Sequence, residues 1–535
     1  MTDRKTRALW ALFVLIGAVS TVLLLRRPLN DRLSDLHIYH GAIRHLQAGQ
    51  PLYEYVAENG GPFTYPPFAA LVLWPIGYVP EGLLQAVWLV LTCAAVVALA
   101  AALGGTLRPT AHRRPMVVAA AACALMLSAP VQSNLRFGQV SIFIVLLALV
   151  DGMGLTPARW RGVLVGIAAA IKLTPLLFVA YFLVSGRCRD AARAGATFVG
   201  CAAIGALVLP SDSVTYWTGT VAQTSRIGNL ASLGNQSVHG MLLRAGVDPG
   251  DLPVIWAALV AVIGVVALLR ARRISLDGRP VHAAVLVGCA TVAISPVSWT
   301  HHQIWPVLAA MLLIAVPPAW QRAAGIALLA TMVLSLGPLL SPVTMRPGVQ
   351  FLFENARALA AVAVCLAGFG GLAVVARQRA STGAGAGSRR GWLRLGAATA
   401  AVVAFFAVQP LPAGADPTFK AYAMADAHNP RYFFVCDGPA ECSEFLGDQL
   451  INFAVTREKT KVRVNGVVGP AVARLAYYSA PGGAARDIPL LQVHAGPRVF
   501  SFRSANLAHG QLVAYAADGS TLAAFRDELD PSEAD

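Results

Sequence analysis

The chain has 535 residues, of which 56% are hydrophobic and only 13% are charged, and its mean hydropathy is +0.60. A soluble globular domain carries about 25% charged residues. This composition therefore excludes a secreted enzyme, a nucleic-acid-binding protein and a disordered scaffold. Apolar runs near the length of ~20 residues that crosses a bilayer recur from residue 8 to residue 412. They predict a polytopic α-helical membrane protein with a soluble tail.

The net charge of +15 is divided unevenly along the chain. Residues 1–415 contain 31 Lys and Arg against 13 Asp and Glu, a net charge of +18, whereas residues 416–535 contain 11 against 14, a net charge of −3. Clusters of Arg in short loops are what the positive-inside rule produces. The basic charge therefore calls for no nucleic-acid partner.

The basic start of the chain leads into an apolar run at residues 8–25. This run is too long for a signal peptide and lacks a small-residue cleavage site, so it predicts an uncleaved first span with a cytoplasmic N-terminus. Residues 26–66 are then expected outside the cell. Arg-rich loops mark the later returns to the cytoplasm in a bacterial plasma membrane, and the runs between them predict roughly 11–13 crossings.

Two apolar segments do not fit a simple count of spans. Residues 68–80 are too few to cross at 1.5 Å per residue, and residues 162–186 lie between two basic loops. Either segment is expected to be re-entrant. A helix broken at Lys172-Leu173-Thr174-Pro175 would place a lysine at membrane depth, where it is tolerated if it lines a cavity. The alternative is a proline kink that serves packing alone.

The sequence predicts four parts along the chain. Residues 1–379 form the transmembrane domain, residues 380–392 a cytoplasmic Gly/Ala/Ser linker, residues 393–412 one further span, and residues 416–535 an extracytoplasmic β-rich domain. Alternating polarity at 461–468, 489–494 and 498–503 predicts strands in the tail. The Asp518-Gly519 turn between 511–515 and 521–525 predicts a hairpin.

The eight cysteines fall into two groups. Six lie in or beside apolar segments without the spacing of metal ligands, and we expect them to pack as small hydrophobic residues. Cys436 and Cys442 lie close together in the polar tail. We expect them to form a disulfide if the tail faces an oxidising space.

The first predicted outer loop contains an acidic candidate, Asp35. Leu36, Tyr39, Ile43 and Leu46 follow it at helical spacing and predict an amphipathic helix that lies in the membrane interface. A carboxylate in the first turn of this helix complements the helix dipole. The alternative is that Asp35 or the preceding serine only caps the helix.

Further polar islands interrupt the apolar sequence on the same predicted side of the membrane. They contain the residues Tyr65, Gln139, Arg226, Asn235, Gln236, His301 and His302. Together with Asp35 and Lys172 they would gather a carboxylate, amides and cations, which suits an anionic lipid-linked substrate meeting a polyhydroxylated acceptor. Adjacent histidines diverge by about 100° on a helix. His301 and His302 are therefore not expected to share a metal ion.

The order of these islands resembles that of a known family. The motifs that carry the likeness are Asp35-Leu36-x-x-Tyr39, Gly49-x-x-Leu52-Tyr53, Phe63-Thr64-Tyr65-Pro66-Pro67, Gly138-Gln139, Lys172-Leu173-Thr174-Pro175, Asn235-Gln236-Ser237 and Ser295-Pro296-Val297-Ser298-Trp299-x-His301-His302. Residues 30–305 resemble the polyprenyl-phosphate-dependent α-mannosyltransferases of glycosyltransferase family 87, which are multi-span enzymes of the GT-C fold class. The resemblance does not extend to residues 389–535.

The resemblance implies transfer of mannose from a β-linked polyprenyl phosphate to a hydroxyl of a lipid-anchored mannoside. It implies inversion to an α-1,2-type linkage at the outer membrane face, with membrane lipid as surroundings and without a metal or other cofactor. Asp35 is the expected general base, because members of the family keep an acidic residue in the first outer loop.

The resemblance also divides the remaining candidates into two roles. The residues expected to hold the donor phosphate are Lys172, Arg226, His301 and His302. The residues expected to contact sugar hydroxyls are Tyr39, Tyr65, Gln139, Asn235 and Gln236. Packing or turn roles are the alternative for each of the second group.

Two other functions stay open at this point. A related arabinofuranosyltransferase would use polyprenyl-phospho-arabinose, and its pocket differs by one hydroxymethyl group that the sequence does not reveal. A lipid flippase or transporter would use the same polar islands to line a path without transferring sugar.

Overall fold

The computed structural model divides the chain into two compact units, Met1–Ala57 with Pro62–Leu411 and Glu58–Gly61 with Pro412–Asp535. It describes residues 2–369 and 422–525, except 28–31, 58–60, 108–109, 223–229, 249, 316–317, 337–345, 427–428, 437–441, 447–449, 458–461, 480–482, 493–497 and 505–509. The linker predicted at 380–392 and the span predicted at 393–412 lie outside the described residues.

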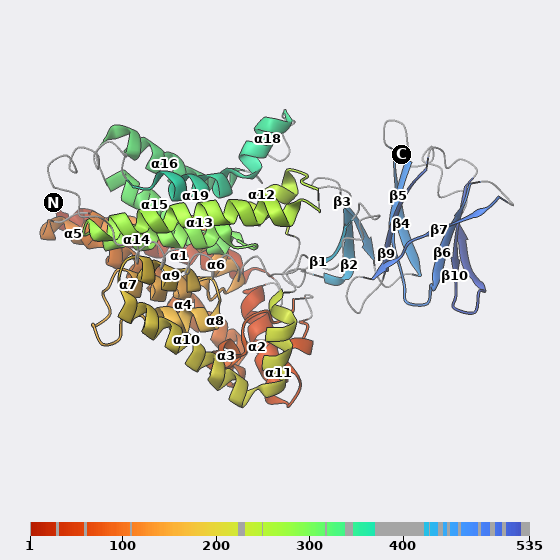
Figure 1. The fold of residues 1–535 in the computed structure, drawn as a ribbon, viewed down its shortest axis with the longest axis horizontal. Helices are drawn as coiled ribbons and strands as arrows, with labels where there is room; N and C mark the ends of the chain where they lie inside the picture. The colour runs from red at the N-terminus through yellow and green to blue at the C-terminus, as the bar shows by residue number, and fades with distance from the viewer. Residues whose placement is uncertain are drawn as a thin grey trace. The chain divides into compact units, whose positions relative to one another are not determined.

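The first unit is helical (Figure 1). Its α-helices are α1 (Thr2–Leu25), α2 (Ser34–Gln47), α3 (Pro67–Leu73), α4 (Glu81–Leu107), α5 (Arg114–Leu127), α6 (Ala129–Phe137), α7 (Ser141–Gly152), α8 (Val163–Ile171), α9 (Leu176–Val184), α10 (Cys188–Val208), α11 (Pro210–Thr218), α12 (Val238–Arg244), α13 (Leu252–Leu276), α14 (Pro280–Ile294), α15 (Ile304–Ala315), α16 (Ala319–Leu334), α18 (Pro347–Glu354) and α19 (Ala356–Ala367). Short 3₁₀ helices are η2 (Leu52–Glu54), η3 (Trp74–Tyr78), η4 (Ala111–Arg113), η5 (Thr220–Ala222) and η7 (Thr300–His302).

Several of these helices have the length and composition of membrane spans. Among the described residues there are four such helices, Arg4–Leu25, Glu81–Leu107, Cys188–Val208 and Leu252–Leu276. The number rises to six if the bent pairs α5 with α6 and α18 with α19 each count as one span. The protein is thus a multi-pass membrane protein, and further apolar helices of 10–17 residues accompany these spans. The expected total of roughly 11–13 crossings stays a prediction.

Prolines divide two of the apolar runs. Ser128 takes an extended conformation before Pro130, and α5 and α6 meet there at an angle of 65°. The run at 162–186 breaks at the predicted position, because α8 ends at Ile171 and α9 begins at Leu176. Lys172 between them has extended backbone angles, φ −149° and ψ 125°. This break confirms the interruption expected from Pro175, since proline offers no N–H to continue the helix.

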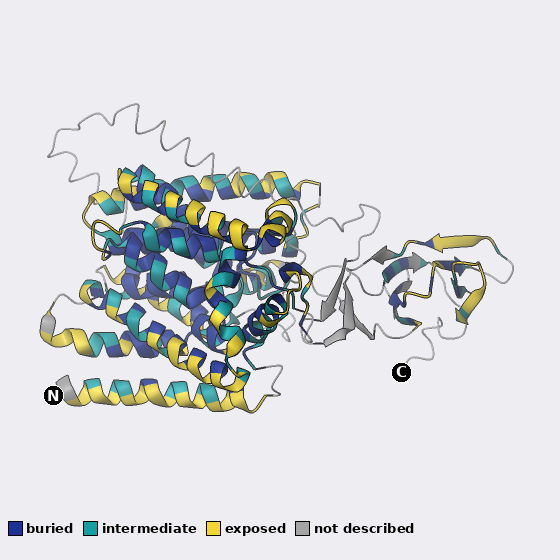
Figure 2. Cartoon of the chain, turned by 90° about the horizontal axis from the view of Figure 1, so that it is seen from below, coloured by how far each residue is buried: buried dark blue, intermediate teal, exposed yellow. Residues whose placement is uncertain are grey.

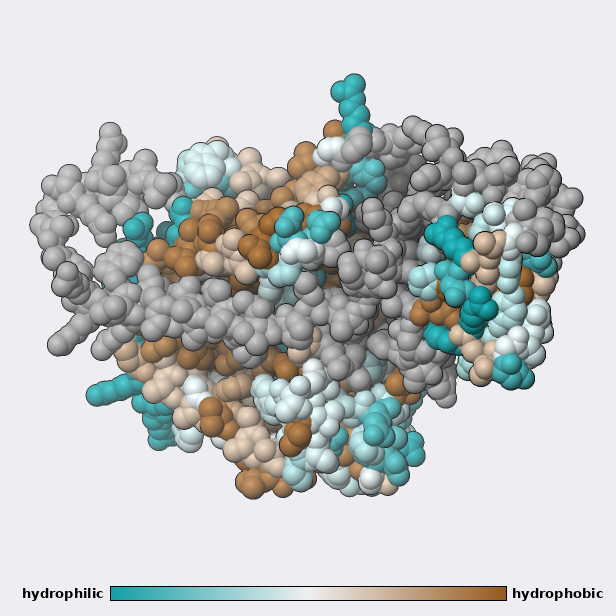
Figure 3. All heavy atoms as spheres, turned by 45° about the vertical axis from the view of Figure 1, so that its right-hand side comes forward, coloured by the Kyte–Doolittle hydropathy of each residue, from teal (hydrophilic) through white to brown (hydrophobic). Residues whose placement is uncertain are grey.

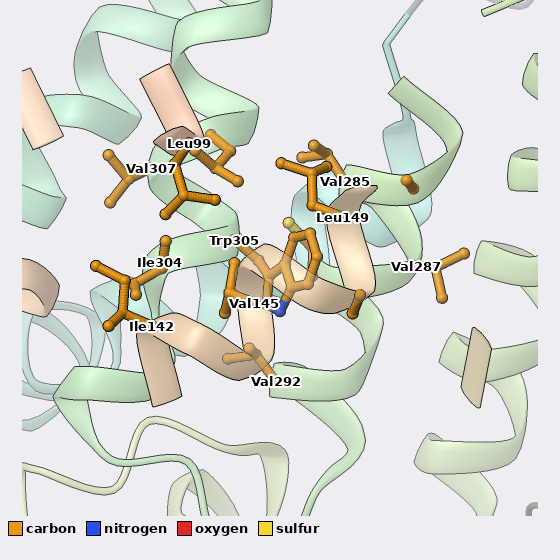
Figure 4. Close-up of a cluster of buried hydrophobic side chains, with 14 of the residues drawn as sticks. Leu99, Ile142, Val145, Leu149, Val285, Val287, Val292, Ile304, Trp305 and Val307 are labelled. Atoms are coloured by element: carbon orange, nitrogen blue, oxygen red, sulfur yellow. The ribbon is translucent and has the colours of Figure 1, made fainter. Parts of the chain in front are cut away.

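The core of the helical unit is built from aliphatic side chains and a few aromatic rings. Figure 4 shows one part of it, in which Trp305 lies among Val145, Val292 and other branched residues of α7, α14 and α15. Buried residues occupy the interior of the unit, whereas α1 carries many exposed ones (Figure 2). Val14 and Leu15 of α1 are 64% and 58% exposed. Apolar side chains exposed to this extent on a long helix suit contact with lipid tails.

The second unit consists of antiparallel strands. They are β1 (Tyr422–Asp426), β2 (Asn429–Cys436), β3 (Cys442–Leu446), β4 (Ile451–Arg457), β5 (Val462–Val468), β6 (Arg474–Tyr478), β7 (Ala485–Ile488), β8 (Leu491–Gln492), β9 (Arg498–Ser504), β10 (Gln511–Tyr515) and β11 (Thr521–Phe525). They form a three-stranded sheet β1-β2-β3 and two four-stranded sheets, β11-β10-β6-β7 and β4-β5-β9-β8. A small core that includes Val464, Leu475, Phe500 and Leu512 joins residues of the two larger sheets.

Most of the strands predicted in the tail are present in the structure. The predicted hairpin is present as β10 and β11, joined at the Asp518-Gly519 turn, and the runs at 461–468 and 498–503 are β5 and β9. The run at 489–494 contains only the two-residue strand β8 among described residues. The backbone register places Cys436 opposite Cys442. The side chains of these two cysteines are not among the described parts of the chain, so the disulfide stays a prediction.

The surfaces of the two units differ in character. In Figure 3 hydrophobic residues gather over the helices, whereas the described strands present mostly hydrophilic and intermediate residues. This difference agrees with a membrane-embedded helical unit and a water-exposed strand unit.

Candidate active site

Asp35 lies in the first turn of α2, on the helix predicted for this position. Leu36, Tyr39, Ile43 and Leu46 form the buried face of α2, as their spacing predicted. Among the described residues no side chain caps the N-terminus of this helix, and the N-cap residue is Leu33, which has a left-handed φ of 45°. The alternative that Asp35 or the preceding serine only caps the helix is therefore wrong.

A hydrogen-bond network connects Asp35 to two tyrosines. Gln139 Nε2 donates to Asp35 Oδ2, and Gln139 Oε1 accepts a hydrogen bond of 3.2 Å from the Tyr65 hydroxyl. The Tyr65 hydroxyl is also 3.0 Å from that of Tyr39. Tyr53 fixes the Tyr65 backbone, because its hydroxyl donates to the Tyr65 carbonyl at 2.7 Å. Gln139 lies in the short connection between α6 and α7, and from there its amide orients the Asp35 carboxylate.

The Lys172 amino group lies beside Tyr65, and we call the part of the site around it the cationic side. Lys172 Nζ lies 5.2 Å from the centroid of the Tyr65 ring and 2.6 Å from His302 Nε2. The other ring nitrogen of His302 accepts a hydrogen bond of 3.1 Å from the Trp299 backbone N–H. Ser141 Oγ is 3.5 Å from Lys172 Nζ and 3.3 Å from Gln139 Oε1, so it joins the cationic side to the Asp35 network.

The packing around Asp35 changes its acidity. Protein atoms surround the carboxyl and raise its pKa from 3.8 to about 7, while the charge of Lys172 acts in the opposite direction. The side chain nevertheless keeps partial solvent exposure. A carboxyl group that has a pKa near 7 and is accessible to a substrate is suited to accept a proton from a bound hydroxyl.

A cavity extends from Lys172 into the helical unit. It encloses about 440 Å³ of empty space, including its opening to solvent. Ser141, Lys172 and His302 supply its polar wall, whereas Phe178 and Trp305 belong to its apolar wall. A cation next to an apolar cavity matches a ligand that carries both a phosphate and a hydrocarbon chain.

Gly138 allows Gln139 to approach Asp35. It ends α6 with a left-handed φ of 65°, which favours glycine. A β-carbon at this position would lie 2.6 Å from the Leu36 Cβ and 2.9 Å from the Leu33 Cβ. Only a residue without a side chain therefore permits the end of α6 to pack this closely on the start of α2.

Replacing Gly138 with alanine is expected to reduce glycosyl transfer at least tenfold and to lower the melting temperature by several degrees. The added methyl group clashes with Leu33 and Leu36 and separates Gln139 from Asp35. The matched control is Gly264→Ala in α13, where a β-carbon would meet no atom within 4 Å. Steady-state transfer rates and thermal unfolding in detergent measure both effects. Equal behaviour of the two variants would contradict this packing role.

The loop that carries His302 is held by buried amide side chains. Asn235 Oδ1 accepts a hydrogen bond of 2.8 Å from the Ser298 N–H, and Asn235 Nδ2 donates to the Pro296 carbonyl at 3.3 Å. On another side, Asn134 Nδ2 donates to the His301 carbonyl at 2.9 Å. These bonds fix the backbone of residues 295–302 and thereby the position of His302.

The side chains of Asn235 and Gln236 form hydrogen bonds with backbone groups. The Gln236 side chain donates to the Glu354 carbonyl at 2.7 Å and accepts from the Ala358 N–H at 3.1 Å. Both side chains are thus occupied by backbone groups, the role named above as the alternative to sugar contact. In this structure Asn235 holds the loop that carries His302, and Gln236 bonds the end of α18 and the start of α19.

Replacing Asn235 with alanine separates these two roles. The substitution leaves the buried Ser298 N–H without an acceptor, at a cost of about 1–3 kcal/mol of stability. We expect a lower melting temperature together with a lower transfer rate. An unchanged melting temperature with a raised Michaelis constant for the acceptor would instead support contact with sugar.

The other expected phosphate-binding residues lie in different positions. The ring of His301 is buried 6.0 Å from that of Phe137 and 4.4 Å from that of His302, measured between centroids. His301 thus supports the neighbouring ring, and no bond to Lys172 joins it to the cationic side in the described residues. Arg226 lies outside the described residues. No group of three or more His, Cys, Asp and Glu side chains suited to a metal ion occurs in the described part of the chain.

Three residues of the site were given no role of their own in the sequence analysis. Ser141 and Asn134 are ordinary polar residues near helix ends, and their contacts with Lys172 and His301 depend on segments more than 30 residues away. Gly138 stood in a recognised motif, but its contact with Leu33 and Leu36 followed only from the structure.

The sequence profile described as Glycosyltransferase family 87 matches residues 63–296. This stretch includes Tyr65, Gln139 and Lys172, begins after Asp35 and ends before His301. The chain is also 33% identical, over 312 residues, to the polyprenol-phosphate-mannose-dependent alpha-(1-2)-phosphatidylinositol pentamannoside mannosyltransferase of Mycobacterium tuberculosis. That alignment covers 56% of this chain and 71% of the relative. The chain belongs to glycosyltransferase family 87.

Other relatives of this glycosyltransferase agree with the assignment. It is 34% identical, over 301 residues, to the polyprenol-phosphate-mannose-dependent alpha-(1-2)-phosphatidylinositol mannoside mannosyltransferase of Mycolicibacterium smegmatis, with 51% of this chain and 68% of the relative aligned. The Mycobacterium tuberculosis protein of that description is 30% identical over 340 residues, which are 59% of this chain and 78% of the relative. No solved structure matches the chain.

Proposed function

We propose that this glycosyltransferase moves mannose from a polyprenyl-phosphate-mannose donor to a hydroxyl of a lipid-anchored mannoside, with Asp35 as the general base. The names of its relatives support the choice of a mannosyl donor and of a phosphatidylinositol mannoside as acceptor. The α-1,2 linkage follows from the same likeness. The geometry around Asp35 supports the role of the base.

The proposed reaction exchanges two bonds at the anomeric carbon. The acceptor oxygen attacks this carbon as its bond to the donor phosphate oxygen breaks, and the acceptor proton passes to Asp35. The products are the α-mannoside and polyprenyl phosphate. Attack from the face opposite the leaving phosphate inverts the β-linked donor. Gln139 orients the carboxylate for this proton transfer, because its amide donates to Asp35 Oδ2.

Lys172 and His302 form the proposed seat of the donor phosphate. As the bond to the sugar breaks, negative charge grows on the phosphate oxygens, and a cation fixed beside them stabilises that charge. Ser141 adds a hydroxyl within reach of Lys172. The apolar wall with Phe178 and Trp305 provides a place for the first part of the prenyl chain.

The proposed side of the membrane is the extracytoplasmic one. The basic residues of the N-terminus lie in the first turns of α1, whose remaining length is apolar and sufficient to span a membrane, and Asp35 lies in α2, the next helix along the chain. If the basic end stays in the cytoplasm, as the positive-inside rule favours, Asp35 lies on the opposite side. In this arrangement the acceptor is an envelope glycolipid.

The observation that carries the proposal is the shared network of Asp35, Gln139, Tyr65, Lys172 and His302. It brings a carboxylate with a pKa near 7 to the hydroxyl of Tyr65 through Gln139, and it brings the Lys172 amino group, with His302 beside it, to the ring of the same tyrosine. A flippase would need no carboxylate oriented in this way.

The test is a transfer assay with membranes that contain this protein and either radiolabelled polyprenyl-phosphomannose or its phospho-arabinose counterpart. We expect transfer of label from the first donor to a phosphatidylinositol mannoside. Transfer from the arabinose donor alone would replace mannose by arabinose in the proposal. Absence of transfer from both donors, in membranes where a related enzyme is active, would overturn it.

A further inference from the structure

The outer face of sheet β11-β10-β6-β7 carries a cluster of aromatic and charged side chains. Residues that face each other in an antiparallel pair lie on the same side of the sheet. The register sets Tyr515 opposite Arg474, and Ala476 opposite Asp487. Leu475 and Tyr477 point into the core of the unit. Since side chains alternate along a strand, their neighbours on β6 belong to the outer face. We call Arg474, Tyr478, Asp487 and Tyr515 the tyrosine platform.

The two tyrosines of the platform lie along the sheet. Tyr515 faces Arg474, which precedes Tyr478 by four residues, so about 13 Å separates the two positions along the strands at ~3.3 Å per residue. Their hydroxyl oxygens are nevertheless only 2.7 Å apart. The side chains must therefore extend toward each other across the face. Ala476 and Val513 lie between them and are only 0% and 6% exposed, as expected if the rings cover them.

A charged pair borders the tyrosines. The Arg474 guanidinium lies 5.0 Å from the Tyr515 ring centroid, and its Nη2 and Nε are each 2.7 Å from Asp487 Oδ1. The side chains of Arg474 and Asp487 are 47% and 67% exposed. This ion pair adds little stability at such exposure, but its donors and carboxylate oxygens are open to a ligand.

We propose that the tyrosine platform binds a neutral oligosaccharide. A pyranose ring has an apolar C–H face and a rim of hydroxyl groups. Tyrosine offers a broad amphipathic surface for the former, and an arginine–aspartate pair offers donors and acceptors for the latter. The two charges cancel, and the tail as a whole has a net charge of −3, which disfavours polyanions and anionic lipid.

This proposal rests on the membership of the chain in a glycosyltransferase family and not on the role of Asp35. A carbohydrate-binding surface on the strand unit would retain a glycan near the enzyme that extends it, and so raise its local concentration.

The experiment uses the full-length protein in detergent and an α-1,2-linked mannotetraose that carries a photoreactive group at its reducing end. Mass spectrometry identifies the labelled peptides. We expect labelling of β6, β7 and β10 that excess unlabelled tetraose suppresses. Tyr478→Ala is expected to reduce this labelling at least tenfold, and Asp487→Asn several-fold. Tyr78→Ala is the control, because Tyr78 is a highly exposed tyrosine of the helical unit.

Several outcomes would overturn the proposal. They are equal labelling of the tail in the wild type and Tyr478→Ala, labelling confined to the helical unit, and recruitment of phosphatidylglycerol vesicles by the same four residues. Asp487→Asn alters an exposed side chain, so it tests the platform even if Tyr478→Ala fails to fold. Because labelling is read on tail peptides, it is independent of transfer. Asp35→Asn is expected to lose transfer and keep the tail label.

Discussion

Replacing Asp35 with asparagine is expected to slow glycosyl transfer by about 10²–10⁴-fold, the usual contribution of a general base. Asparagine has nearly the same shape as the carboxylate, and its side-chain oxygen can still accept from Gln139. The substitution thus removes the proton acceptor and leaves the surroundings in place. The measurement is the turnover number of the purified protein with a polyprenyl-phosphomannose donor and a phosphatidylinositol mannoside acceptor.

The stability of Asp35→Asn separates loss of chemistry from loss of fold. Burial raises the pKa of Asp35 from 3.8 to about 7, so the charged carboxylate destabilises the folded state increasingly as pH rises across that interval. Asparagine is neutral, so above pH 7 the variant avoids the desolvation cost that the charged Asp35 carboxylate imposes on the wild type. The variant should therefore melt at pH 8 no lower than the wild type. A loss of transfer smaller than tenfold in the folded variant would rule out Asp35 as the base.

Replacing Lys172 with alanine is expected to lower kcat/KM for the donor by about 10²–10³-fold, as does removal of one group that stabilises developing charge. Lys172 is proposed to hold the donor phosphate in both the bound substrate and the transition state. The Michaelis constant of the donor should therefore rise, and the turnover number should also fall. Initial rates at varied donor concentration separate the two effects.

Two variants serve as controls for Lys172→Ala. Lys172→Arg keeps a positive charge, and we expect it to retain part of the lost activity although the guanidinium differs in shape. Lys5→Ala removes the same charge from an exposed position of α1 and should have no effect. A normal donor Michaelis constant in Lys172→Ala would exclude a phosphate seat at this lysine.

The features that sequence predicted best are those controlled by local chemistry. Pro175 predicted the helix break beside Lys172 because proline removes a backbone donor wherever it occurs. The spacing of Leu36, Tyr39 and Ile43 predicted the buried face of α2. In the tail, alternation around the Asp518-Gly519 turn predicted the hairpin of β10 and β11. The strands β1–β4, β6 and β7 lacked such a clear alternation or turn, and they were not predicted.

The candidate site was predicted in part. A polar residue within an apolar run can be recognised from the sequence alone, even when the residue that it contacts is far away in the chain. Asp35, Tyr65, Gln139, Lys172 and His302 were all candidates, and the structure brings them together.

Their mutual contacts depend on tertiary packing. Asp35 and Gln139 are 104 positions apart, and no local rule relates them. Asn235 and Gln236 show the opposite case. An amide that bonds a sugar and one that bonds the backbone look the same in a sequence, and here the backbone occupies both.

The pH dependence of kcat/KM tests the proposed role of Asp35 most directly. Only the ionised carboxylate accepts a proton, so the rate should rise about tenfold per pH unit from pH 5 and level off near pH 7, where burial places the pKa of Asp35. The residual activity of Asp35→Asn should lack this rise. A wild-type rate that is constant between pH 5 and pH 7, or one that rises equally in the variant, would contradict the assignment of Asp35 as the base.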